Sequence, residues 1–176
     1  MTNIMKLLSF LVVIPCIAFA QLGDYAFTQL KGEDGLSQTT ILNITQDYKG
    51  FMWFGTGNGL NKYDGYNFTI YNDIPNDSTS LSNNSVTAFY EDKQRNFWVG
   101  TSDGYLNKFD RAKDNFVRIN IAGLVQAPTI AEENYYDYPI VFSRNTVGAI
   151  TFITEDNYGN LWLGTWGRGV IIYNKA

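Results

Sequence analysis

Short apolar runs alternate with polar turns along this chain, and three of these segments share one pattern. In each, an Asp opens a turn, an apolar run centred on Trp follows, and Gly-Thr ends the run. The three copies occupy residues 47–56, 92–101 and 156–165, so their Trp residues lie 45 and then 64 residues apart. The chain is therefore built from repeats of about 45 residues, and the second interval contains an insertion of about 19.

Each repeat predicts a set of short strands. A first strand precedes the Asp, and the Trp-centred run forms a second strand whose lack of polar alternation indicates burial on both faces. Asn58-Gly59 and Asp103-Gly104 are hairpin signals that lead into a third strand. A fourth strand follows in the first two copies only. The predicted strands are 41–46, 52–54, 60–64 and 67–71; 86–91, 97–99, 105–110 and 115–119; and 150–155, 161–163 and 170–174.

Repeats of this length, made of short strands and Gly turns, are typical of β-propeller blades, which bury their faces only by stacking on one another. We therefore predict an all-β protein, a β-propeller with about three four-stranded antiparallel blades. Residues 25–30 resemble a fourth strand without a blade, and the third copy lacks one, so these segments are expected to close a ring. Because propellers typically have about 4–8 blades, we expect an incomplete ring. The chain is then a fragment of a larger propeller, or one of several identical chains that form a ring together.

The domain bounds follow from this repeat. Residues 1–20 are interpreted as a signal peptide, because Lys6 precedes an apolar stretch that ends at Ala18-Phe19-Ala20. This stretch is shorter than the roughly 20 residues that a membrane span requires, so we expect a periplasmic protein with no span of its own. The predicted units are an N-terminal ring-closing strand in 21–34, blade 1 at 35–79, blade 2 at 80–145 with the insertion at 120–145, and an incomplete blade 3 at 146–176.

Composition excludes several classes of function. The chain has no His, and its one Cys, Cys16, lies in the predicted signal peptide. Disulfides, thiolate or imidazole metal sites and a His general base are therefore not expected, and we predict no metal and no cofactor. Loss of Lys6 leaves 13 − 1 = 12 basic against 17 acidic residues. This acidic balance disfavours a nucleic-acid partner.

Residues that recur once per repeat are interpreted as structural. Asp is expected to form the turn, Trp to pack in the core, and Gly to mark a close approach of backbones. These residues are Asp47, Trp53, Gly55, Asp92, Trp98, Gly100, Asp156, Trp162 and Gly164. A shared carboxylate site is disfavoured, because each Asp belongs to a different blade.

Ligand-binding residues are expected where the copies differ. Trp166 and Arg168 lie between the second and third strands of copy three, and a Trp face beside a guanidinium suits a sugar. Packing against a further blade is an equal alternative. The insertion carries Tyr135, Tyr136 and Tyr138 among acidic residues, and these side chains either bind a glycan or cover a seam between blades.

No pattern in the chain supports catalysis. Glycoside hydrolysis requires two facing carboxylates, and no pair is singled out beyond the turn residues. Phosphate-binding Gly loops and nucleophile motifs are missing from the sequence. We therefore predict no enzymatic activity for this chain.

The repeat resembles a known family. Gly35-Leu36-Ser37, followed from Asp47 by Asp-x-x-Gly-x-x-Trp-Phe-Gly-Thr-x-x-Gly-Leu-x-x-Tyr-Asp, resembles the two-component regulator propeller repeat. The resemblance implies the N-terminal part of a periplasmic sensor region in a hybrid two-component regulator, which senses oligosaccharides to control polysaccharide use. An oligosaccharide and further propeller blades are the partners it implies. Two alternatives are the first blades of an exported glycan lyase or sialidase-like enzyme, and a stand-alone glycan-binding propeller.

Overall fold

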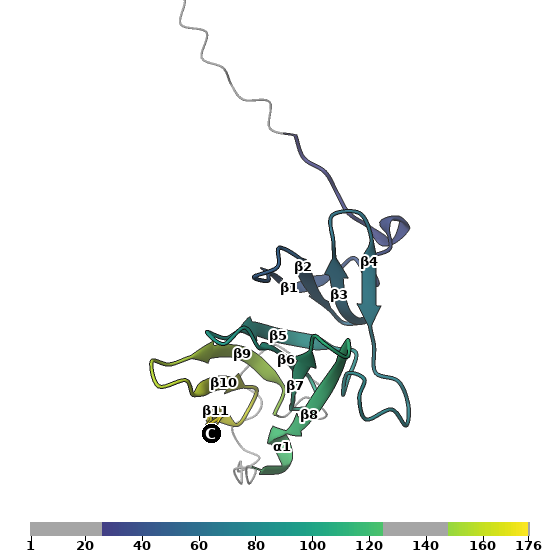
Figure 1. The fold of residues 1–176 in the computed structure, drawn as a ribbon. Coiled ribbons are helices and arrows are strands. Elements are labelled where there is room, and N and C mark those ends of the chain that lie inside the picture. Colours follow the sequence, from purple (N-terminus) through teal and green to yellow (C-terminus); the bar gives the residue numbers. More distant parts are fainter. Residues whose placement is uncertain (1–25, 125–147, 176) are drawn as a thin grey trace, which may run out of the picture.

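The computed structural model describes residues 26–124 and 148–175, which form three separate antiparallel sheets (Figure 1). Strands pair in chain order within each sheet. Blade 1 contains β1 (Ile41–Gln46), β2 (Met52–Thr56), β3 (Gly59–Tyr63) and β4 (Phe68–Tyr71). Blade 2 contains β5 (Val86–Glu91), β6 (Phe97–Thr101), β7 (Tyr105–Asp110) and β8 (Asn115–Asn120). Blade 3 contains β9 (Ile150–Glu155), β10 (Leu161–Thr165) and β11 (Gly169–Tyr173).

The arrangement is that of an open β-propeller, as the repeat predicts. The first strands β1, β5 and β9 contact one another in succession, as the inner strands of neighbouring blades do. Each repeated Trp lies in the second strand of its own sheet. All the predicted strands in residues 41–174 form, and their ends differ from prediction by only a few residues.

The N-terminal segment differs from expectation. Residues 26–30 form no strand, and the first element is a short 3₁₀ helix, η1 (Gly32–Asp34). The backbone of residues 26–30 extends away from the sheets (Figure 1), so it gains none of the ladder hydrogen bonds that stabilise a strand. A four-residue helix that the sequence pattern did not predict, α1 (Ile121–Leu124), follows β8.

Two seams between blades hold the core. In the first seam the Trp53 ring stacks on Phe97 of blade 2, with ring centroids 4.6 Å apart. In the second seam the rings of Trp98 and Tyr173 of blade 3 form a T-shaped pair with centroids 6.0 Å apart. The buried residues of the first seam are Trp53, Leu60, Leu81, Val86, Phe89, Phe97, Val99, Phe109 and Phe116. Those of the second are Ala88, Trp98, Leu106, Ile121, Ile150, Ile153, Leu161 and Leu163.

The repeated Gly permits this close stacking. A Cβ atom on Gly55 would lie 3.0 Å from the Phe89 side chain, and one on Gly100 would lie 2.7 Å from Ile150 Cβ. Both neighbours belong to the first strand of the next blade. Side-chain atoms do not pack at such distances without displacement, so the blades approach closely because these two positions lack a side chain.

On the face of blade 3 that is turned away from blade 2, one expectation is wrong. Trp162 is 40 % exposed, whereas Trp53 and Trp98 are 0 % and 3 % exposed, so it does not lie in a core. The reason is that this face corresponds to the one that blades 1 and 2 press against their successors, and no described residue covers it. Phe152, Val170 and Ile172 are exposed on the same blade.

Candidate functional site

The antiparallel order gives every blade two rims. The turn between the first and second strands, which the repeated Asp opens, lies at one end together with the turn between the third and fourth strands. We call this end the Asp rim. The turn between the second and third strands and the connection to the next blade lie at the opposite end, which we call the connection rim.

At the Asp rim, each repeated Asp joins its turn to the Trp six residues later. Asp47 Oδ1 accepts hydrogen bonds from the backbone N–H of Lys49 and of Phe51 at 2.9 and 3.1 Å. Its Oδ2 accepts from Trp53 Nε1 at 3.0 Å. Asp92 and Asp156 accept from Trp98 and Trp162 at 2.8 and 2.9 Å. The Asp therefore satisfies the one polar atom of the Trp ring as well as shaping the turn.

A cation from the following blade completes each buried pair. Arg111 Nη1, after β7, lies 2.7 Å from Asp47 Oδ2. Lys175 Nζ, after β11, lies 2.9 Å from Asp92 Oδ2 and 2.7 Å from Glu155 Oε1. The side chains of Asp47 and Asp92 are fully buried, so these ion pairs tie one blade to the next in a region of low dielectric.

A Glu of the following blade adds a second tie. Glu91 Oε2 accepts from the backbone N–H of Tyr48 at 2.8 Å, and Glu155 Oε2 accepts from that of Lys93 at 3.0 Å. Each Glu ends the first strand of its blade. Blade 1 has Gln46 at that position, and its short turn 64–67 contains no basic residue.

The buried carboxylates titrate below their ordinary range. Burial by itself would raise the pKa of Asp47, but the hydrogen bonds from Trp53 and Arg111 outweigh it and lower the pKa. In Asp92 the same opposition, with Trp98 and Lys175 as donors, brings the pKa to about 2. These carboxylates are therefore charged in the folded protein throughout the neutral and mildly acidic range.

A pH prediction follows from Asp92. Because its folded pKa of about 2 lies below the ordinary value of 3.8, its contribution to stability is present above about pH 4 and is lost as the pH falls toward 2. We expect Asp92→Asn to reduce the slope of unfolding free energy against pH in that interval. Urea unfolding at a series of pH values from 2 to 7 measures this slope. An unchanged slope would show that other groups carry the acid sensitivity.

At the connection rim, blades 1 and 2 contain matching buried polar triads. Ser37 Oγ lies 3.1 Å from Thr56 Oγ1, and Asn61 Nδ2 donates to Ser37 Oγ at 2.8 Å. In blade 2 the triad is Ser82, Thr101 and Asn107, with the two hydroxyl oxygens 2.8 Å apart. Thr56, Asn61, Thr101 and Asn107 are fully buried, so the triads fix the lead-in to each first strand.

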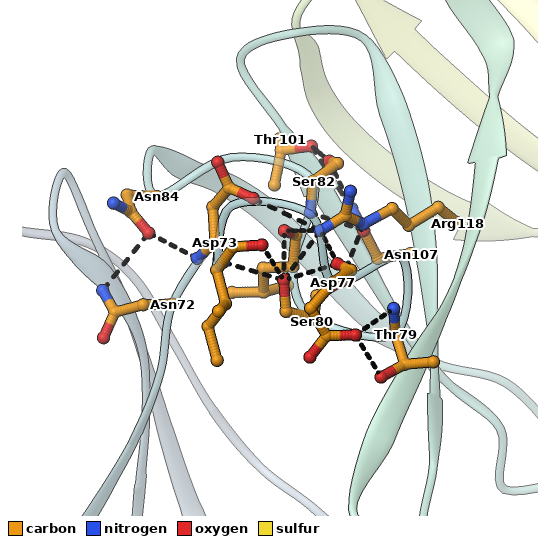
Figure 2. A network of polar contacts seen from close by, with 12 residues as sticks. Asn72, Asp73, Asp77, Thr79, Ser80, Ser82, Asn84, Thr101, Asn107 and Arg118 are labelled. Carbon is orange, nitrogen blue, oxygen red and sulfur yellow. Dashed lines mark hydrogen bonds and ion pairs between the residues drawn. The ribbon is translucent and has the colours of Figure 1, made fainter.

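The connection between blades 1 and 2 is anchored by Arg118 of β8 (Figure 2). Its Nη2 donates to Ser80 Oγ at 2.7 Å and to the carbonyl oxygens of Asp77 and Leu81 at 2.8 and 2.6 Å. It also lies 3.3 Å from Asp73 Oδ1. The guanidinium thus satisfies the backbone of a long connection and has a structural role.

Blade 3 carries the sequence-predicted pair at the same rim. Trp166 and Arg168 lie in the turn between β10 and β11, and both are partly buried. The Trp166 backbone is tied to the lead-in of β9, since Trp166 N donates to Ala149 O at 2.8 Å and Gly148 N donates to Trp166 O at 2.7 Å. The turn therefore sits against the end of the long connection that follows blade 2. Tyr135, Tyr136 and Tyr138 belong to that connection and lie outside the described residues.

Two other features are absent from the described ranges, 26–124 and 148–175. No group of three or more His, Cys, Asp or Glu side chains in them is placed to hold a metal ion. Within the same ranges, no helix is long and apolar enough to cross a membrane.

The family comparison decides what the repeats are. The family model described as "Two component regulator propeller" matches residues 35–58, 80–103 and 146–167, one segment in each blade. These three segments are two-component regulator propeller repeats. Each matched segment contains the Asp, Trp and Gly-Thr of the repeat.

Known proteins that are similar to this chain in sequence or in structure belong to signalling systems. Histidine kinase P4 of Formosa agariphila is 48 % identical over 63 residues, which are 36 % of this chain and 5 % of that protein. The extracellular domain of BT3049 from B. thetaiotaomicron, assigned to a hybrid two-component system, has a TM-score of 0.62 and 29 % identity. The match covers 84 % of this chain and 19 % of that one. The extracellular domain of BT4673 from the same organism has a TM-score of 0.51 and 28 % identity, over 75 % and 16 % of the two chains.

The two structural likenesses are to extracellular domains of signalling proteins, and the chain shares the fold of these domains. It spans less than a fifth of the length of each of these relatives.

Sequence reasoning missed the polar contacts between repeats. The Asp–Trp bond had a signal, because a buried indole N–H needs an acceptor and the Asp recurs six residues ahead of every Trp. The contacts between blades had a weaker signal in the second and third copies. Both have a Glu at the end of the first strand and a basic residue after the third, namely Arg111 or Lys175.

Proposed function

We propose that this chain is part of the ligand-sensing propeller of a hybrid two-component regulator, exported to the periplasm by residues 1–20, and that its ligand is an oligosaccharide. The fold and the repeats of extracellular signalling domains support the sensing role. Carbohydrate recognition is supported by Trp166 and Arg168, an aromatic residue and a guanidinium that belong to one turn at the connection rim.

We choose this site because blade 3 differs from blades 1 and 2 in the turn at the connection rim. The equivalent turns of blades 1 and 2 are small, polar and engaged within their own blade. Asn58 Nδ2 donates to the carbonyl oxygen of Ser37 at 3.3 Å, and Ser102 Oγ donates to Asn83 Oδ1 at 3.1 Å. Only blade 3 presents an aromatic ring in this turn among the described residues. A symmetric scaffold acquires a specific site where one repeat departs from the others in this way.

A glycan array probed with the full chain, followed by calorimetric titration of the best glycan, tests this function. We expect Trp166→Ala to weaken binding at least about tenfold, a loss of roughly 1.4 kcal/mol. Tyr66→Ala is the matched control, because Tyr66 is an exposed aromatic residue on the Asp rim of blade 1 and is 88 % exposed. Binding of no glycan, or equal losses in the two variants, would refute the assignment. Cleaved glycan in a mass spectrum would instead favour an exported enzyme.

A further inference from the structure

The Asp rim of the first seam carries two guanidinium groups around one aromatic ring. Tyr48 follows the repeated Asp of blade 1, and its backbone N–H donates to Glu91 Oε2 of blade 2 at 2.8 Å. The Cζ atoms of Arg95 and Arg111, both of blade 2, lie 5.3 and 5.0 Å from the centre of the Tyr48 ring. We call Tyr48, Arg95 and Arg111 the Tyr48 cluster. Blades 1 and 2 have all four strands, so complete sheets position it from both sides.

Two members of the Tyr48 cluster do not recur in the other repeats. The position of Tyr48 is occupied by Lys in blade 2 and by Asn in blade 3, and that of Arg95 by Gly in blades 1 and 3. The second seam forms its contacts between Asp, Lys and Glu without either residue. Stacking of the blades therefore requires neither Tyr48 nor Arg95. On a repeated scaffold, such a departure from the other copies marks a candidate specific site.

Arg95 has a backbone conformation that suits glycine. Its φ is 67°, in the left-handed region, and Gly50 and Gly159 at the same position of their turns have φ of 89°. An L-residue costs more free energy in this region than Gly does, because its Cβ crowds the backbone. Residues held in sparsely populated conformations cluster at functional sites. An Arg at this position therefore indicates a use beyond forming the turn.

The Arg95 side chain gains little from its neighbours. It is 64 % exposed, and its ion pair with Glu91 spans 4.0 Å. Glu91 Oε1 also lies 3.8 Å from Arg111 Nη2, so one carboxylate serves two guanidinium groups. Exposed ion pairs of this kind contribute little to stability. The positive charge of Arg95 is thus only partly neutralised within the protein.

The solvent-facing part of the cluster is an aromatic ring with two cations. Tyr48 is about half exposed, and exposed Lys49 places its Nζ 5.9 Å from the centre of the Tyr48 ring. The carboxylates lie beneath, because the Asp47 side chain is fully buried and that of Glu91 is largely buried. The whole chain has a net charge of −4, so this surface reverses the average charge. An anionic group is therefore attracted here.

We propose that the Tyr48 cluster binds an acidic glycan through the carboxylate of one of its sugars. The Arg95 guanidinium donates two parallel hydrogen bonds to this carboxylate, a geometry that a Lys amine does not offer. Tyr48 holds the guanidinium through its ring and presents an aromatic surface to the sugar, and Lys49 adds positive charge. The site lies on the rim opposite to Trp166 and does not rest on the proposed function.

The composition of the site favours a short acidic glycan over a macromolecule. A stable protein interface buries about 800 Å² on each partner around a largely apolar core, whereas one ring and two cations are exposed here. A nucleic acid would cover far more of the surface, where the acidic balance of the chain opposes it. A short oligosaccharide places one carboxylate on Arg95 without covering the acidic surface around it.

Calorimetric titration of trigalacturonate into the full chain tests this site, with neutral maltotriose as the matched ligand. We expect Arg95→Gly to weaken binding of trigalacturonate at least about tenfold. The same change is expected to leave maltotriose titrations unaltered and not to lower the urea midpoint of unfolding, because Gly suits this turn. Arg95→Lys should restore binding only in part, since it keeps the charge but not the paired donors.

Lys113→Ala is the matched control variant. Lys113 is an exposed residue of the same blade and the same rim, and its replacement removes the same charge as Arg95→Gly. We expect it to change the affinity for trigalacturonate less than about twofold, because exposed charges away from the ligand are screened by salt. A specific role of Arg95 is thereby separated from attraction by the charge of the blade.

Several results would overturn the assignment. One is the absence of binding at millimolar trigalacturonate, and another is an equal loss in Arg95→Gly and Lys113→Ala. Loss of trigalacturonate binding in Trp166→Ala but not in Arg95→Gly would remove this site while supporting the proposed function. Equal affinity for inorganic sulfate would assign the cluster to a free oxyanion. Tighter binding of polyglutamate than of trigalacturonate would assign it to an acidic protein segment.

Discussion

Replacing Asp92 by Ala is expected to lower the free energy of unfolding by about 3 kcal/mol. The side chain is fully buried, and its loss leaves the Trp98 indole N–H and the Lys175 amine without their shared acceptor. Breaking a buried ion pair by removing one partner costs about 3–5 kcal/mol. The lower end applies here because Lys175 retains Glu155 and is 16 % exposed. Urea unfolding at pH 7, followed by tryptophan fluorescence, measures the change.

Asp156→Ala is the matched control for this prediction. Asp156 makes the same turn and the same bond to its Trp, but among the described residues no cation of another blade reaches its carboxylate. Its replacement is expected to cost clearly less stability than Asp92→Ala, because only the hydrogen bonds of an accessible turn are lost. Equal losses in the two variants would show that the cation of the neighbouring blade adds nothing to the stability of the seam.

Gly100→Ala is expected to destabilise the protein by about 3 kcal/mol, although it adds a single methyl group. The new Cβ would lie 2.7 Å from both Cβ and Cγ2 of Ile150, which is fully buried in blade 3. These atoms belong to the stiff base of a β-branched side chain and cannot rotate away, so the two blades must separate. Overpacking of a core costs about 1–3 kcal/mol and occasionally more. Denaturant unfolding at neutral pH gives the value.

Gly164→Ala tests whether the close approach is the cause. Gly164 is the equivalent residue of blade 3, and a Cβ there would lie 3.3 Å from Phe152 Cβ of its own sheet. We expect a change below about 1 kcal/mol, since the neighbouring strand can shift by a few tenths of an ångström. A loss as large as that of Gly100→Ala would point to the strand itself rather than to contact between blades.

The strands could be predicted because their signals are local. Asn58-Gly59 and the apolar run around Trp53 each specify a turn or a buried strand within a few residues. The contacts across seams could not be predicted in the same way. Arg111 and Asp47 are 64 residues apart in the chain, and only the stacking of blades brings them together.

The candidate site, too, could be predicted only in part from the sequence. A difference between copies pointed to Trp166 and Arg168, but sequence alone does not show that the Trp166 backbone is bonded to the lead-in of β9. For Trp162 the sequence pattern gave the wrong prediction. Its sequence context is that of a core residue, yet its burial depends on a neighbouring surface that the local pattern does not encode.

Each polar contact across a seam has two different halves, an Asp on the preceding blade and a Glu with a basic residue on the following blade. This difference bears on how such proteins change their number of blades in evolution. Blade 2 offers an Asp to its successor and a Glu with an Arg to its predecessor, so duplicating its gene segment would create a new seam with both halves already present. Blade 1 has only the Asp, because Gln46 and a short turn stand where the other half would be. A copy of blade 1 placed in the middle of an array would leave the preceding Asp without its counterion, so internal expansion is expected to draw on the later repeats.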